Sequence, residues 1–181
     1  MKYKSKKAFT LIEMVVVVAL VAIVGVAVIS IMTPAGNMFA KMQSQAQTKM
    51  IASGILQAIE PQVRFGTDLS VLSSQSQIVS GDDNRYIYIK NNRVYTRKEN
   101  QSNSSEYDLF GVAFYNNYNI SMDCSVPAPN TVQISITASN SDRSVTSMVT
   151  TTVQNMNSSS VSGNGSVLRY EWRTAPPSQS S

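Results

Sequence analysis

The chain has 181 residues, of which 43% are hydrophobic and 14% are charged, and its formal net charge is +4. This length suits one ordinary domain with an appended segment. The sequence has no His and a single Cys, Cys124, which excludes His-based catalytic groups, His-ligated metals, an intramolecular disulfide and a thiolate cage around zinc. We therefore expect no catalytic, cofactor-binding or metal-binding residues.

The positive charge is concentrated at the N-terminus. Four lysines, Lys2, Lys4, Lys6 and Lys7, lie among the first eight residues, and the rest of the chain balances eleven Lys and Arg against eleven Asp and Glu. Residues 9–181 therefore carry no net positive charge. An excess of positive charge is the usual indication of nucleic-acid binding, so its absence argues against a nucleic-acid partner. Lysines placed just before an apolar run are instead typical of the cytoplasmic flank of a membrane segment.

An apolar run of 24 residues with a single charge extends from Phe9 to Met32. It exceeds the ~20 residues that a helix needs to cross a bilayer, and it is longer than the ~7–15-residue core of a secretory signal peptide. The alternative, a buried helix of a soluble domain, would need a large apolar partner that the remaining sequence does not offer. We predict a single transmembrane helix with its N-terminus in the cytoplasm.

The one charge in this run, Glu13, is unexpected in a plain membrane anchor. A carboxylate costs roughly 2.5–3.5 kcal/mol at the centre of a membrane helix and less near the interface. One interpretation is that the Glu13 side chain extends to the membrane interface, where water solvates its carboxylate. The other is that a charge on a partner meets Glu13 when subunits assemble.

The octet around this residue, Lys7-Ala8-Phe9-Thr10-Leu11-Ile12-Glu13-Met14, resembles the class III signal of type IV pilins and pseudopilins. The resemblance implies that prepilin peptidase cuts between Ala8 and Phe9, that the new amine of Phe9 is N-methylated, and that Glu13 acts in assembly. Leaders of the family usually end in Gly, so we expect slower cleavage after Ala8.

The resemblance also implies an α+β, ladle-shaped fold with a long kinked helix packed on an antiparallel β-sheet head. We predict a basic leader over residues 1–8, a transmembrane and assembly segment over 9–33, an amphipathic half-helix over 34–60, an extracytoplasmic β-rich head over 61–175 and a flexible tail over 176–181. The partners implied are other pilin or pseudopilin subunits, prepilin peptidase, an inner-membrane assembly platform and membrane lipid.

The helical pattern continues over residues 35–60. Two sets of residues follow i, i+4 spacing: Met38, Met42, Ala46 and Met50, and Ile51, Ile55 and Ile59. We interpret the methionine stripe as core packing against the head. Pro34 cannot donate a backbone hydrogen bond and Gly36 adds backbone freedom, so we predict a kink there. We expect the helix to stop at Glu60-Pro61, because a residue before Pro is pushed out of the helical region.

The remaining sequence is rich in Ser, Asn and Thr and has the alternation of strands. Tyr86–Lys90 and Arg93–Arg97 flank Asn91-Asn92, which predicts a hairpin with a type I′ turn. For residues 62–80 the sequence leaves open a short helix or an irregular connection. Residues 98–107 are predicted to form a polar loop. Further strands are predicted at Leu109–Tyr115, Ile120–Val126, Val132–Ala138 and Val145–Val153, with an edge strand at Leu168–Arg173.

Three features of the head could carry chemistry. Gly81-Asp82-Asp83-Asn84 has the oxygens that calcium prefers but lacks the spacing of a calcium loop, so a solvated turn is the simpler interpretation. The tyrosines and basic residues of the hairpin could contact DNA or form a half-buried sheet face. Cys124, centred in a strand pattern, is expected to be a small buried residue.

We conclude from the sequence that the protein is a structural subunit of a pilus-like filament of a bacterium, a minor pilin or minor pseudopilin, and not an enzyme. It would serve adhesion or motility, protein secretion, or DNA uptake. The alternative is a signal-anchored extracytoplasmic binding or adhesion domain that does not polymerise.

Overall fold

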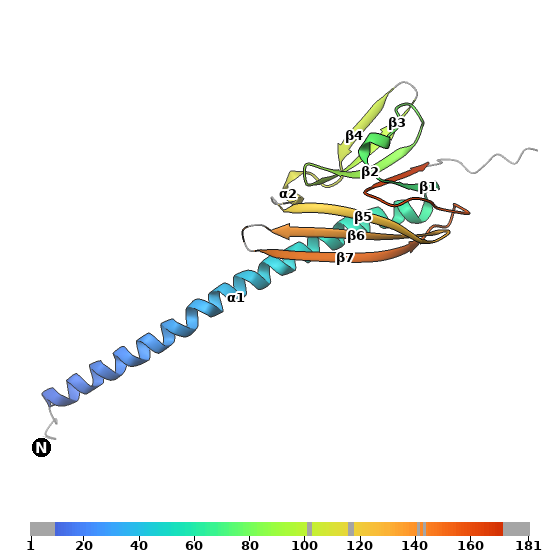
Figure 1. The fold of residues 1–181 in the computed structure, drawn as a ribbon. Coiled ribbons are helices and arrows are strands. Elements are labelled where there is room, and N and C mark those ends of the chain that lie inside the picture. Colours follow the sequence, from blue (N-terminus) through green and yellow to red (C-terminus); the bar gives the residue numbers. More distant parts are fainter. Residues whose placement is uncertain (1–9, 101–102, 116–117, 141, 143, 172–181) are drawn as a thin grey trace, which may run out of the picture. The chain divides into compact units, whose positions relative to one another are not determined.

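The computed structural model describes residues 10–100, 103–115, 118–140, 142 and 144–171. The chain divides into two compact units, Met1–Met42 and Gln43–Ser181. One long helix, α1 (Leu11–Phe65), supplies the described part of the first unit and continues into the second (Figure 1).

The second unit adds two antiparallel sheets to the last part of α1. The five-stranded sheet has the order β1-β8-β2-β3-β4 and the three-stranded sheet the order β5-β6-β7. The α+β fold with a long helix packed on antiparallel β-structure is thus confirmed, with two sheets in place of the single sheet that we expected. The elements are β1 (Thr67–Leu72), η1 (Gln75–Gln77), β2 (Arg85–Lys90), β3 (Arg93–Glu99), β4 (Ser104–Asp108), α2 (Val112–Tyr115), β5 (Asn119–Ala128), β6 (Thr131–Asn140), β7 (Val145–Gln154) and β8 (Val167–Glu171).

One core joins the helix to both sheets. On α1, Ile55, Ile59 and Val63 are fully buried, and they belong to the same cluster as Ile87 of β2 and Ile134 of β6. Burying a side chain of this size stabilises the fold by roughly 1.5–3 kcal/mol. The helix is therefore fixed to the head by apolar contacts that begin near residue 51.

The methionine stripe does not belong to this core, so our interpretation of it was wrong. Met38, Met42 and Met50 are 66%, 57% and 66% exposed. Met50 directly precedes the buried Ile51, and successive residues of a helix point about 100° apart. The core face is set by the Ile residues, which leaves the methionines on an outer face of α1.

The helix also continues past the predicted stop at Glu60-Pro61 and ends at Phe65. Tertiary contacts outweigh the local effect of Pro61. The Asn155 side chain donates hydrogen bonds to the carbonyls of Val63 and Gly66, and the Met156 N–H donates to Arg64 O at 2.8 Å. These bonds satisfy carbonyls that the end of a helix otherwise leaves unpaired.

Most predicted strands are present, with four corrections. The hairpin is confirmed, and Asn91 and Asn92 have the positive φ values, 50° and 59°, that its turn requires. The ambiguous region holds strand β1, the expected polar loop contains strand β4, and the strand predicted at Leu109–Tyr115 is instead a turn followed by the short helix α2. Strand β8 lies between β1 and β2 and is not an edge strand.

Candidate functional site: the N-terminal segment

Glu13 lies in the first turn of α1 and forms a reciprocal pair with Thr10. The Thr10 N–H and hydroxyl each donate to Glu13 Oε2 at 3.0 Å, and the Glu13 N–H donates to Thr10 Oγ1 at 3.3 Å. This is a capping box, in which the two side chains satisfy amides that the start of a helix leaves free. Ala8 and Phe9, the predicted cleavage residues, lie outside the described residues.

Only one oxygen of the Glu13 carboxylate takes part in this box. Oε1 has no hydrogen-bond partner among residues 10–171 that the structure describes. Glu13 therefore caps its own helix and keeps an acceptor for another group. We missed the box in the sequence, although Thr10-x-x-Glu13 is its usual signature.

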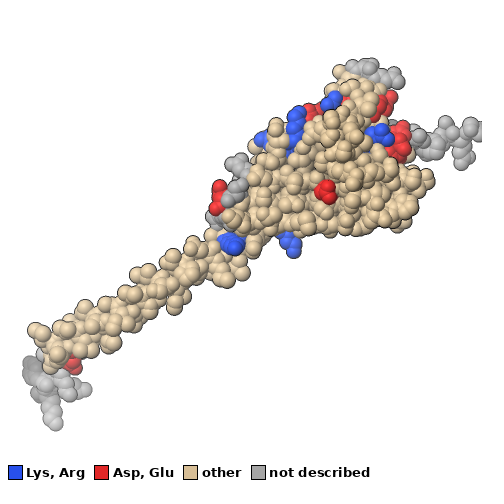
Figure 2. Space-filling model, viewed as in Figure 1, with Lys and Arg blue, Asp and Glu red and all other residues tan. Residues whose placement is uncertain are grey.

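The helix surface that follows Glu13 is apolar and open. No residue of α1 before Ser44 is buried, and the large side chains from Leu11 to Met32 are about half exposed or more. Figure 2 shows that this stretch carries almost no coloured, charged side chains. This helix is long and apolar enough to cross a membrane. A continuous apolar surface of this kind marks a site for lipid or for other helices.

Pro34 and Gly36 lie within this open stretch, and α1 is helical through both of them. Pro34 cannot donate to the carbonyl of Ser30. Just before it, the Ser30 hydroxyl donates to Val26 O at 2.8 Å and the Thr33 hydroxyl to Ile29 O at 3.3 Å. The predicted kink stays a prediction.

Residues 3–29 match the family described as the prokaryotic N-terminal methylation motif. The chain carries a prepilin signature. The matched stretch includes Ala8, Phe9 and Glu13 and ends before the head, and it supports a processed subunit that is similar to type IV pilins or pseudopilins. No curated protein and no solved structure gave a significant match to the chain.

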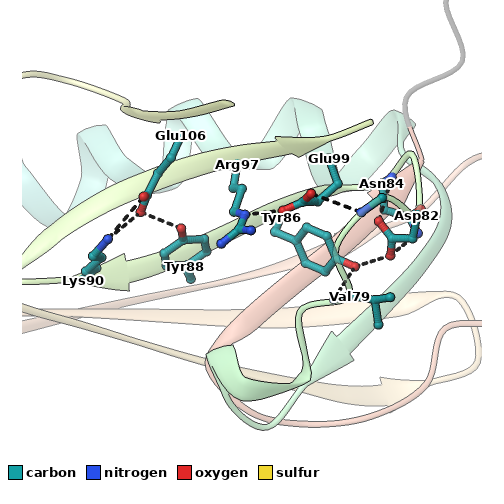
Figure 3. A network of polar contacts seen from close by, with 10 residues as sticks. Val79, Asp82, Asn84, Tyr86, Tyr88, Lys90, Arg97, Glu99 and Glu106 are labelled. Atoms are coloured by element: carbon teal, nitrogen blue, oxygen red, sulfur yellow. Dashed lines mark hydrogen bonds and ion pairs between the residues drawn. The ribbon is translucent and has the colours of Figure 1, made fainter. Parts of the chain in front are cut away.

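Outside the prepilin signature, a polar network follows one face of the head (Figure 3). The Tyr88 hydroxyl donates to Glu106 at 2.6 Å, Lys90 pairs with the same carboxylate at 3.0 Å, and Arg97 pairs with the buried Glu99. The hydrogen bond from Tyr88 lowers the pKa of Glu106; burial opposes this shift and the bond from Lys90 adds to it.

This network argues for a half-buried sheet face over a DNA-contacting patch. Tyr86 and Tyr88 are buried, and three of the five cations of the hairpin, Lys90, Arg93 and Arg97, each have a carboxylate partner. Paired cations release few counterions from a nucleic-acid backbone and so contribute little to binding.

In the acidic turn at Gly81–Asn84, the carboxylate oxygens of Asp82 accept hydrogen bonds from other groups of the protein. Asp82 accepts from the Asn84 N–H at 3.1 Å, from the Asn84 amide at 2.8 Å and from the Tyr86 hydroxyl. Burial opposes ionisation of Asp82, but the bonds from Asn84 and Tyr86 outweigh it and lower the pKa. In the part of the chain that the structure describes, no three acidic or Cys side chains gather into a metal-binding group.

Cys124 is 1% exposed and belongs to the core, as predicted. Burial raises the pKa of its thiol to about 12. The thiolate, which is the reactive form, is therefore scarce at neutral pH.

Proposed function

We propose that the protein is a subunit of a type IV pilus-like filament, a minor pilin or minor pseudopilin, and that it has no catalytic role. The observation that carries this proposal is the junction of the prepilin signature with an exposed apolar stretch of α1, Leu11–Met32, in which Glu13 is the one carboxylate. The filament would serve adhesion or motility, protein secretion, or DNA uptake.

Processing comes first in this proposal. Prepilin peptidase cuts between Ala8 and Phe9, and the free amine of Phe9 is then methylated. The cut removes all four lysines of the leader, so the net charge of the chain falls from +4 to zero. The Thr10–Glu13 box survives the cut, because the Thr10 N–H belongs to the peptide bond between Phe9 and Thr10.

Assembly uses the apolar surface of α1. Before assembly this surface contacts lipid of the cytoplasmic membrane of a bacterium, with the N-terminus inside. The inner-membrane assembly platform then moves the subunit into the filament, where other pilin or pseudopilin helices replace the lipid. The Phe9 amine of one subunit pairs with the free Oε1 of Glu13 on a neighbour, which neutralises both charges in an apolar setting.

Intact-mass analysis of the protein from cells with and without prepilin peptidase tests this function. We expect a chain that begins at methylated Phe9 in the first strain and at Met1 in the second. A chain that keeps residues 1–8 in the presence of the peptidase would favour the alternative, a signal-anchored binding or adhesion domain that does not polymerise.

A further inference from the structure

Strand β7 forms an open edge of the head. Among the described residues it pairs only with β6, in an unbroken register from Asn140↔Val145 to Thr131↔Gln154. Figure 1 shows β7 as the outer strand of its sheet. An unpaired strand edge presents a row of N–H and C=O groups to which another strand can bind.

The other edges of the two sheets are shortened, charged or covered. Strand β4 has five residues and contains Glu106 and Asp108. The Val71 N–H of β1 donates to Ser162 O at 2.9 Å, and Cys124 of β5 exchanges backbone bonds of 2.7 and 2.9 Å with Gly165. By contrast, β7 is ten residues long and contains no charge, no Pro and no Gly. It lacks the features by which edge strands avoid pairing.

The backbone groups of this edge are arranged symmetrically. The Asn155 N–H donates to Asn130 O at 2.8 Å, and hydrogen-bonded and non-hydrogen-bonded pairs alternate along an antiparallel ladder. The even-numbered residues of β7 therefore direct their N–H and C=O groups away from β6. These residues are Thr146, Met148, Thr150, Thr152 and Gln154, and all of them are exposed.

We propose that β7 pairs antiparallel with β7 of a second copy of this chain, with Thr150 on the two-fold axis. In this register Thr146 faces Gln154 of the second copy and Met148 faces Thr152, so every outward backbone group meets a partner. No charged side chains oppose one another. The exposed Met148, at 68%, packs over a threonine methyl group. The two three-stranded sheets become one continuous sheet.

The geometry decides which subunits this contact joins. Thr48 of α1 lies beside Ser147 at the start of β7, with hydroxyl oxygens 2.7 Å apart, and Arg64 lies beside Met156 after its end. The head portion of α1 therefore runs in the same direction as β7, and antiparallel pairing of two β7 strands places the two helices in opposite directions. Subunits inserted side by side in one membrane have parallel helices. If the protein is a filament subunit as proposed, the contact links filaments that run in opposite directions.

Disulfide trapping of the full-length chain in detergent tests the register. Thr150→Cys should form a dimer on mild oxidation, because residues that face one another as a hydrogen-bonded pair have Cα atoms ~5.5 Å apart. Met148→Cys alone should give only background, because its two copies lie about four residues apart along the strand, ~13 Å. A mixture of Met148→Cys and Thr152→Cys should give the mixed dimer. Cys124 stays in every variant because it is buried.

A charge-substitution pair tests the edge itself. Ser135 and Thr150 face one another on β6 and β7 and share a hydroxyl hydrogen bond of 2.9 Å, so Ser135→Lys and Thr150→Lys remove the same bond. In sedimentation at rising protein concentration, Thr150→Lys should abolish the dimer, since like charges meet at the axis, and Ser135→Lys should keep it. Equal crosslinking at all positions, efficient Met148→Cys homodimers, or a chain that stays monomeric throughout would overturn the proposal. None of these measurements requires a filament, so they are independent of the proposed function.

Discussion

In the proposed assembly Glu13 would have two separable roles, one for each oxygen of its carboxylate. Oε2 closes the capping box with Thr10, and Oε1 is left for a partner. A capping residue needs an acceptor but no charge. Pairing with a cationic amine needs the charge itself.

Glu13→Gln separates these two roles. The amide oxygen keeps the capping bond but loses the charge, so we expect normal cleavage and membrane insertion and roughly tenfold lower incorporation into filaments, equivalent to ~1.4 kcal/mol. Glu13→Leu, which loses both roles, should be at least as defective, and Thr10→Ser, which keeps the box, should be normal. Wild-type incorporation of Glu13→Gln in quantitative immunoblots of sheared filaments would show that capping alone matters.

Asn155 is the single residue on which the end of α1 most depends. It is 2% exposed, donates to two helix-end carbonyls and accepts from the N–H groups of Asn157 and Ser158. We expect Asn155→Ala to lower the free energy of unfolding by about 2–3 kcal/mol, because buried groups lose their partners. Asn157→Ala removes one exposed bond to Phe65 O and should cost less than about 1 kcal/mol. Urea unfolding followed by tyrosine fluorescence would measure both, and equal losses would contradict this account.

The lowered pKa of Glu106 predicts an acid-dependent loss of stability. Its folded pKa lies below the unfolded value of ~4.3, so the stabilisation is complete above that pH and is lost as pH falls through the folded pKa. Tyr88→Phe removes the main donor and should flatten the fall in stability below pH 5, at a cost near neutral pH of roughly 1 kcal/mol, since Glu106 is partly exposed. Tyr95→Phe, on the same hairpin, should keep the wild-type slope. Identical slopes for the two variants would exclude Tyr88 as the cause.

At the scale of elements, the sequence predicts a helix or strand best where neighbouring residues alone determine it. The β2–β3 hairpin follows from alternating Tyr and Ile around a two-residue Asn turn, which needs no distant partner. Strand β4 is polar throughout, and only its pairing with β3, for example Glu106 opposite Arg97, makes it a strand. The helix end at Phe65 likewise depends on Asn155, 90 residues further along the chain. The prepilin signature and Glu13 are local and were found, whereas the open edge of β7 depends on sheet order and could not be.

Pro34 and Gly36 are the residue types that most lower the stability of a helix, so we expect α1 to be least stable around them. An added methyl group at Gly36 or Gly25 would meet nothing within 4 Å, so Gly→Ala at either position changes only helix propensity, by about 1 kcal/mol. Pro34→Ala restores a backbone donor and should stabilise the helix locally by up to ~3 kcal/mol. Hydrogen exchange of the amides at 35–40 in detergent should slow markedly in Pro34→Ala, less in Gly36→Ala and not in Gly25→Ala. Equal exchange in all variants would contradict a locally weakened helix, and a filament map with an unbroken straight helix through residues 30–40 would contradict the predicted kink.

At the scale of the whole molecule, the residues proposed for assembly differ from those that hold the fold. The apolar surface proposed for assembly lies on α1 before Ser44, where no described residue is buried, whereas the hydrophobic core that holds the head begins at Ile51. Charged side chains gather over β2, β3 and β4, whereas the area over β5, β6 and β7 is mostly uncharged (Figure 2). A subunit built in this way can lose lipid contacts and gain helix contacts without any change in the core of its head.

This separation predicts that the fragment Gln43–Ser181 folds without the rest of the chain. The described part of this deletion, residues 10–42, includes no buried side chain, so removing residues 1–42 should leave the free energy of unfolding within about 0.5 kcal/mol of that of the full chain in detergent. A fragment that begins after Ile55 is the matched control, because it lacks the fully buried Ala52 and Ile55 and should be destabilised by several kcal/mol or fail to fold. Urea unfolding and amide proton spectra of the two fragments would decide. If Gln43–Ser181 were unfolded in water, residues before Ser44 would have to support the head, and the division of α1 into an assembly part and a folding part would be wrong.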